Sequence, residues 1–187
     1  MKKRYKTPQE IIAEQKRLAG LKQRKYKLGY ATCGTMYAYA LWKKEGFTQG
    51  MIRKYSDLVN GYWENFSDEL VSRVQTELKK KAEIELEVEQ WEDYEKPKDY
   101  QAGYLWEMKQ IDNQILRDHF RYNVCHYAAL LDMGWGKKRL VRIADETNEY
   151  LQDESIKKKG VDMMWKELVE ELGVFYDRPD IQFKVTE

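Results

Sequence analysis

The stretch YALWKKEGFTQGMIRKYSDLVNGY, residues 39–62, and the stretch YAALLDMGWGKKRLVRIADETNEY, residues 127–150, decide the expected fold. Aligned at an offset of 88 positions, they are identical at six of 24 positions. We interpret them as two copies of one helix-turn-helix unit. The identical pairs are Tyr39/Tyr127, Ala40/Ala128, Gly46/Gly134, Asp57/Asp145, Asn60/Asn148 and Tyr62/Tyr150.

Each copy is predicted to turn at a glycine followed by an aromatic residue, Gly46-Phe47 or Gly134-Trp135. Glycine adopts positive φ without penalty just past a helix end, and the aromatic ring can then fold back onto the finished helix. Apolar residues recur at helical spacing after each turn, which predicts a core-facing stripe. The stripes contain Ile52, Tyr55, Val59, Tyr62 and Trp63 in the first copy, and Leu140, Ile143, Ala144, Thr147, Tyr150 and Leu151 in the second.

Further helices are predicted around these units. A short amphipathic helix is expected over residues 8–19, after which Gly20 loosens the helical pattern, and a buried helix over 35–44. Ser67 is a good start for the next helix, a further one runs from about 104 to 132, and the last begins at Asp162 and ends at Gly173. Residues 82–88 alternate as a half-exposed strand would, although a continuing helix is favoured because no partner strand is visible.

The order helix, turn, helix, loop and capped helix is therefore expected twice. It predicts an all-α fold in which two tandem copies of a three-helix module pack as a pseudo-dimer, since each alone is short for a stable core. Lys96-Pro97-Lys98 marks the boundary between them. The predicted divisions are a basic N-terminal arm at 1–28, the first module at 29–95, the second at 96–176 and a C-terminal tail at 177–187.

The composition agrees with long helices that have solvated faces. The 187 residues are 42% hydrophobic and 35% charged, with only 3 prolines. The two cysteines fall at non-equivalent places in the two copies, so a disulfide is not expected. No run approaches the roughly 18 apolar residues of a membrane span, and a cytoplasmic location without membrane contact is predicted.

Charge is unevenly distributed along the chain. Residues 1–28 hold ten Lys or Arg against two Glu, a local charge of +8 in a chain whose formal charge is +1. Such an arm is typical of nucleic-acid binding, because basic side chains displace counterions from phosphates, although a solubilising tail has the same composition. The candidate contacts are Lys16, Arg17, Lys22, Arg24, Lys25 and Lys27.

A second basic candidate follows the turn of the second copy. Lys137, Lys138 and Arg139 precede a predicted helix whose N-terminal amides can receive a phosphate. The first copy has Gln49, Gly50 and Met51 at these positions. These cations therefore contact a phosphate or nucleic acid in one copy only. The alternative is that they only increase the solubility of the protein.

A polar set recurs in both copies beside the apolar stripe. A cation and a carboxylate three residues apart support an exposed helix slightly, and the alternative is a polar rim around a partner surface. The set consists of Lys54, Asp57 and Asn60 in the first copy, and Arg142, Asp145 and Asn148 in the second.

The sequence contains no recognisable catalytic or metal-binding arrangement. His119 and His126 are seven residues apart on one predicted helix, roughly 10.5 Å along its axis, which is too far for one metal ion. Cys125 neighbours His126, but adjacent helical residues point about 100° apart and cannot act as nucleophile and base. We expect a structural role for both histidines, and no catalytic residue, metal or cofactor.

The segment from Ala128 to Leu140, together with Asn148, resembles small uncharacterised proteins from phages and prophages of Gram-positive bacteria. The likeness covers mainly residues 120–172. It implies a non-enzymatic accessory protein in the host cytoplasm that binds and inhibits or redirects a host factor, for example a defence protein, either alone or as a homodimer. The alternative is a DNA- or RNA-binding protein that uses the basic arm.

A host-binding role of this kind predicts an exposed aromatic patch. Its candidate members are Tyr37, Trp42, Trp63, Trp91, Trp106 and Trp165.

Overall fold

The computed structural model describes residues 7–86, 100–152 and 160–174. These ranges contain helices and no strand, which confirms the all-α class. The helices are α1 (Pro8–Glu45), α2 (Gln49–Glu64), α3 (Asp68–Ala82), α4 (Tyr100–Asp132), α5 (Lys137–Gln152) and α6 (Val161–Leu172). None of the described helices combines the length and the apolar character that crossing a membrane requires.

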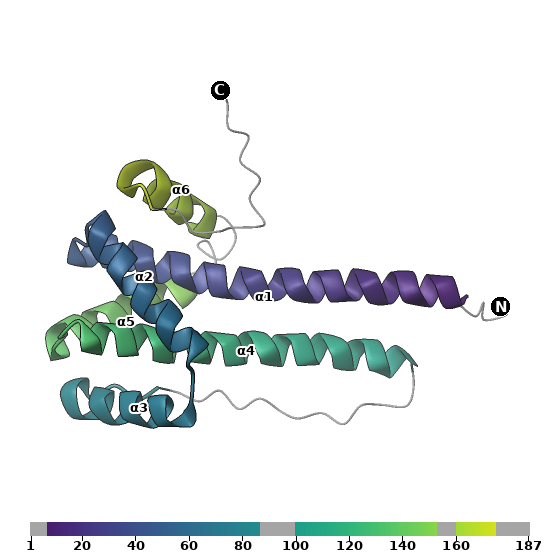
Figure 1. The fold of residues 1–187 in the computed structure, drawn as a ribbon, viewed down its shortest axis with the longest axis horizontal. Helices are drawn as coiled ribbons and strands as arrows, with labels where there is room; N and C mark the ends of the chain where they lie inside the picture. The colour runs from purple at the N-terminus through teal and green to yellow at the C-terminus, as the bar shows by residue number, and fades with distance from the viewer. Residues whose placement is uncertain (1–6, 87–99, 153–159, 175–187) are drawn as a thin grey trace.

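The two longest helices, α1 and α4, lie side by side (Figure 1). They run parallel, because Gly34 lies by Tyr122 and, further along both helices, Tyr37 stacks on His126 with ring centroids 4.0 Å apart. The approach is close at Gly34, where an added Cβ would lie 3.2 Å from the hydroxyl oxygen of Tyr122. The missing side chain of Gly34 thus makes room for the Tyr122 ring.

Helix α1 corrects the expected N-terminal organisation. A short helix over 8–19 and a second from 35 were predicted, but one helix of 38 residues runs through Gly20. Its start is fixed by a capping box in which the Thr7 hydroxyl accepts from the Glu10 amide and the Glu10 carboxylate accepts from the Thr7 amide. A single glycine costs a helix about 1 kcal/mol, which good helix formers on both sides outweigh.

The remaining helices pack across the α1–α4 pair. Helix α2 contacts mainly α4, whereas α5 contacts α1; α3 packs on α4 and α5, and α6 packs on α1. Figure 1 shows α2 crossing the long pair. The bounds of α2, shifted by 88 positions, are those of α5. Helices α2 and α3, which follow α1 in sequence, are therefore supported mainly by α4. Helices α5 and α6, which follow α4, are supported by α1.

Both predicted glycine–aromatic turns are confirmed. Gly46 and Gly134 have φ of 67° and 78°, in the left-handed region. The amide of Phe47 donates to the carbonyl of Leu41 at 3.2 Å, and that of Trp135 to Leu130 at 3.1 Å. Both rings are buried and meet edge to face, with centroids 5.7 Å apart. The two turns thus contact each other in the core.

Most of the predicted stripes lie in one core. Six of their residues are buried: Ile52, Tyr55, Val59, Leu140, Ile143 and Thr147. Tyr62, Trp63 and Ala144 pack against this core while half-buried. The side chains of Tyr150 and Leu151 lie outside the described residues.

Two local expectations are wrong. Helix α3 ends at Ala82, so residues 83–86 form neither the favoured helix nor the alternative strand. Glu83 adopts left-handed dihedrals with φ of 59°, and its amide caps the carbonyl of Lys79. Ile84 and Leu86 then pack against the core, which draws the chain away from the helix axis. The N-cap of α6 is Gly160 without a side-chain hydrogen bond, not Asp162, which lies in the first turn.

Other predicted helix ends are confirmed. The Ser67 hydroxyl accepts from the amide of Leu70 at the start of α3. Helix α4 reaches Asp132, and Gly173 ends α6 with φ of 67°.

Candidate functional site

A shallow hollow of about 600 Å³ lies along the outer face of α5. It brings together members of two predicted sets, Lys137 and Lys138 of the phosphate set and Arg142 and Asp145 of the partner set. The lining residues are Lys137, Lys138, Val141, Arg142, Asp145, Glu146 and Glu149. Cations occupy the N-terminal end of the hollow and carboxylates the C-terminal end, so its surface is polarised along the helix.

Several of these cations already hold internal contacts. Lys137 pairs with Glu83 at the end of α3. Arg139 donates to the carboxylate of Glu45 at 2.8 Å and lies 4.0 Å over the Trp135 ring, and Arg142 donates to the same carboxylate at 2.6 Å. The Glu45 side chain is only 3% exposed. Arg139 and Arg142 therefore attach α5 to the end of α1, in addition to any outward contact.

Lys138 and Asp145 remain on the surface of the hollow. Both are exposed. Glu146 is more enclosed and pairs with Lys44 of α1 at 3.1 Å. Asp145 is also near Tyr127, whose pKa is raised to about 12 by burial first and by that carboxylate second. Asn148, the third member of the polar set, is exposed on the same helix.

The corresponding set on α2 is also exposed. Lys54, Asp57 and Asn60 all stand on the outer face of α2, while its inner face packs on α4. The position equivalent to Lys137 is Gln49, whose amide donates to the carbonyl of Gly173 at 2.6 Å. The two polar sets thus occupy equivalent exposed faces, but only α5 adds the cations of residues 137–139.

The basic arm is helical in its backbone from Pro8 onward. Lys16 is exposed. The side chains of Arg17, Lys22, Arg24, Lys25 and Lys27 lie outside the described residues.

A buried polar cluster at the α1–α2–α4 contact was not predicted. The hydroxyl of Tyr55 and Nδ1 of His126 share a hydrogen bond of 2.6 Å, and both side chains are buried. Burial lowers the pKa of His126 to about 3, so the ring is neutral. Tyr37 donates to the side-chain oxygen of Asn123, and burial raises the pKa of Tyr37 well above its usual value. The sequence feature that marks this cluster is His126, because the equivalent position of the first copy is Ala38.

The other histidine and the cysteines are also part of the fold. His119 is half-buried on α4. Cys33 and Cys125 are buried free thiols, and burial raises the pKa of each to about 12. A thiol with so high a pKa is not a nucleophile near neutral pH.

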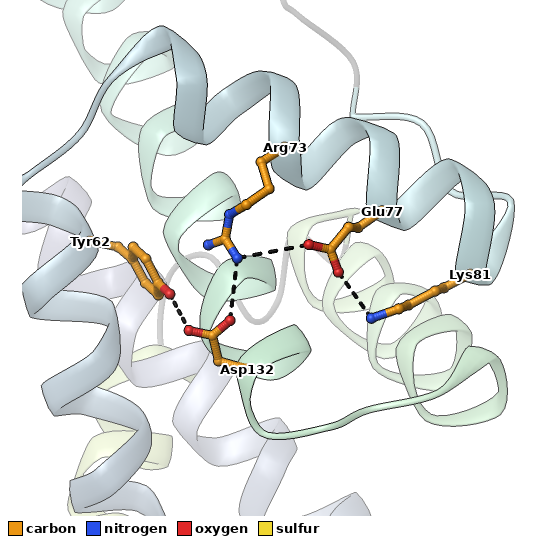
Figure 2. Close-up of polar contacts among 5 residues, drawn as sticks. All are labelled: Tyr62, Arg73, Glu77, Lys81 and Asp132. Atoms are coloured by element: carbon orange, nitrogen blue, oxygen red, sulfur yellow. Dashed lines mark hydrogen bonds and ion pairs between the residues drawn. The ribbon is translucent and has the colours of Figure 1, made fainter.

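A surface network joins α2, α3 and α4 (Figure 2). Asp132 accepts from the Tyr62 hydroxyl and pairs with Arg73 at 3.4 Å. Glu77 pairs with Lys81 at 2.9 Å and so extends the network along α3. This network fixes α3 against the end of α4.

The expected exposed aromatic patch is not formed by its described members. Tyr37 and Trp165 are buried. Trp42 and Trp63 are half-buried, and cations cover them, with Lys43 at 3.6 Å over Trp42 and Arg121 at 4.2 Å over Trp63. These rings are used in packing, which is why they are not available as a surface. The side chains of residues 91 and 106 lie outside the described residues.

Comparisons of this chain with protein-family models, with curated proteins and with solved structures found no match.

Proposed function

We propose that this chain is a non-enzymatic phage accessory protein that binds a host factor, such as a defence protein, through the outer face of α5. The observation that supports this most is the hollow on α5, where the predicted polar residues meet the predicted cations. Its polarised charge favours a partner with an acidic region followed by a basic one, because complementary potentials select partners and speed association.

The proposed binding unit is a pseudo-dimer of two three-helix modules. Three observations support it: the shared bounds of α2 and α5, the packing of each on the other module's long helix, and the contact of Phe47 with Trp135. A fourth is that the first residues of α2 and α5 each bind the C-cap residue of the other module's third helix. Gln49 binds the carbonyl of Gly173, and Lys137 binds the carboxylate of Glu83.

The modules are similar but their outer faces differ, so the test compares charge reversal on α5 with charge reversal elsewhere on the surface. We expect Lys138→Glu with Asp145→Lys to reduce capture of the host factor from lysate about tenfold or more, since both side chains are exposed and reversal opposes the partner's charges. The matched control is Lys80→Glu with Glu64→Lys, which reverses two other exposed charges on α3 and α2. Equal loss in both variants, or no loss in either, would refute the role of α5.

Nucleic-acid binding by the basic arm is the second candidate. The specific observation in its favour is that the arm continues α1 as a helix and extends, beside α4, beyond α2, α3, α5 and α6 (Figure 1). A continuous helical backbone places these basic sequence positions at a regular rise along one axis, which suits a phosphate backbone.

The test keeps the helix and removes the charge. Replacing Lys16, Arg17, Lys22, Arg24, Lys25 and Lys27 by Gln should abolish DNA or RNA binding together with its steep salt dependence. Nuclease treatment of the lysate separates the candidates, because it removes a nucleic-acid-mediated capture and leaves a direct protein contact. Binding that is unaffected by the six substitutions would exclude the arm.

A further inference from the structure

We infer that the two halves of this chain, residues 7–86 and 100–174, are built to recognise each other and to reject their own copies. The inference rests on the pseudo-dimer proposed above and goes beyond the binding role. In a pseudo-dimer, either half could in principle pair with a second copy of itself. Three sets of interface residues are complementary only when a first half meets a second half.

The first set concerns size at the α1–α4 contact. Gly34 and Ala38 of α1 stand where α4 has Tyr122 and His126, at the same offset of 88. The ring of Tyr122 occupies the space beside Gly34. Two first halves would place glycine opposite glycine, so the space would be filled only if the two long helices moved closer together, whereas two second halves would place Tyr122 against its own copy. Either pairing would thus require a separation of the long helices different from the one that the remaining interface contacts fix.

The second set is the buried hydrogen bond between Tyr55 and His126. At the related positions, Ile143 of α5 and Ala38 of α1 are both buried and apolar. A pair of first halves would place the Tyr55 hydroxyl near Ala38, which has no side-chain acceptor. A pair of second halves would place His126 near Ile143 instead of a hydroxyl. Two first halves would thus leave the buried Tyr55 hydroxyl without the His126 ring nitrogen, and two second halves would leave that nitrogen without the hydroxyl. Both losses are unfavourable.

The third set concerns charge at the ends of the long helices. Lys44 ends α1 and pairs with Glu146 of α5 at 3.1 Å. The related residue of α4 is Asp132, which pairs with Arg73 of α3 at 3.4 Å (Figure 2). Two first halves would bring Lys44 toward Arg73, and two second halves would bring Asp132 toward Glu146. Like charges would meet in both cases, which is how paired helices exclude wrong partners.

The test uses the full chain with a specific protease site placed within residues 87–99, cut after folding. The cut protein is unfolded in urea, refolded by dilution and examined by native mass spectrometry. We expect complexes of one first half with one second half. A statistical mixture, in which only roughly half of the complexes are mixed, would overturn the inference because it shows no selection.

Exchanging the charges sharpens the test. Lys44→Asp with Asp132→Lys makes like-with-like pairs favourable at the charged sites, so homodimers of halves should appear after refolding. The control, Lys80→Asp with Glu149→Lys, changes the charge of each half equally at exposed positions and should retain mixed pairs. Identical pairing in the two variants would overturn the role of the charges.

A measurement on the uncut chain covers the case in which the cut halves do not refold. There, Lys44→Asp with Asp132→Lys should lower the urea midpoint, because it faces Glu146 with an acid and Arg73 with a base. The control shares only the acid in the last turn of a helix and should lower the midpoint less. An unchanged midpoint in the first variant would also overturn the charge argument. Both measurements use purified protein alone, so they are independent of whether α5 binds a host factor.

Discussion

The hydroxyl of Tyr55 and Nδ1 of His126 are 2.6 Å apart, and this buried contact joins α2 to α4. It places a titratable ring at the centre of the fold, where Tyr37 stacks on its face. A proton on this ring would be isolated from water, because His126 is completely buried. The stability of the fold should therefore depend on pH.

Acid should destabilise the protein through His126. Its pKa is lowered from 6.5 to about 3 in the folded chain, so unfolding takes up a proton between these values. The contribution of neutral His126 to the free energy of unfolding is fully present above about pH 6.5. It is lost as the pH falls toward 3, at about 1.4 kcal/mol per pH unit. Urea unfolding should give a free energy about 2 kcal/mol lower at pH 5 than at pH 7 from this group. Tyr55→Phe with His126→Phe should remove that difference, whereas His119→Gln should retain it.

Glu45 should matter more to stability than Asp132, although both carboxylates bind an arginine. The Glu45 side chain is 3% exposed between Arg139 and Arg142, while Asp132 is 37% exposed. Glu45→Gln should cost about 2 kcal/mol, because the neutral amide weakens two charge-assisted hydrogen bonds, while the arginines, 41% and 56% exposed, stay hydrated. Asp132→Asn should cost less than about 1 kcal/mol and respond to salt. Thermal or urea unfolding in low and high salt measures both, and equal costs would contradict the expected ranking.

The glycines of the two turns should not tolerate alanine. Gly46 and Gly134 have left-handed φ, and an added Cβ on either would meet nothing within 4 Å. The cost of Gly46→Ala or Gly134→Ala is then conformational and should be about 1 kcal/mol. Gly61 lies within α2 with equally open space and no positive φ, so Gly61→Ala should instead stabilise the fold by about 0.5–1 kcal/mol. Chemical unfolding of the three variants tests whether the signs differ.

Neither cysteine should react in the folded protein. Burial raises the pKa of Cys33 and Cys125 to about 12, so almost no thiolate forms at pH 8, and both side chains are enclosed. A thiol reagent should label both only through opening or unfolding of the chain, and labelling in urea should be rapid. The single variants Cys33→Ser and Cys125→Ser assign the signals. Fast labelling under native conditions would contradict the described burial.

Local chemistry made much of the fold predictable. The turns at Gly46 and Gly134 follow from two adjacent residues, and the stripe of Ile52, Tyr55 and Val59 follows from helical spacing. The continuity of α1 through Gly20 did not follow, since a breaker residue outweighs its neighbours only when they are weak helix formers. The turn at Glu83 was hidden for a related reason, because a non-glycine residue with positive φ leaves little trace in sequence.

The candidate site was predictable only as separate parts. Sequence comparison identified Lys138 by its absence from the first copy and Asp145 by its presence in both, but it could not place them in one hollow. It also could not show that Arg139 and Arg142 share the carboxylate of Glu45, which lies 94 and 97 positions away. Contacts at such separations depend on how the helices pack rather than on local pattern. The patch expected from the tryptophans was wrong in its described part because aromatic residues serve packing as readily as binding.

The parallel course of α1 and α4 has an electrical consequence. Each helix carries a macrodipole with roughly half a positive charge at its N-terminus, and parallel packing places both positive poles at the same end of the molecule. In antiparallel helices these poles would cancel. At the N-terminus of α1 this pole lies at the same end of the long axis as the basic arm (Figure 1). Such an asymmetric charge distribution favours one orientation when the molecule approaches a charged partner, and added salt should weaken this preference.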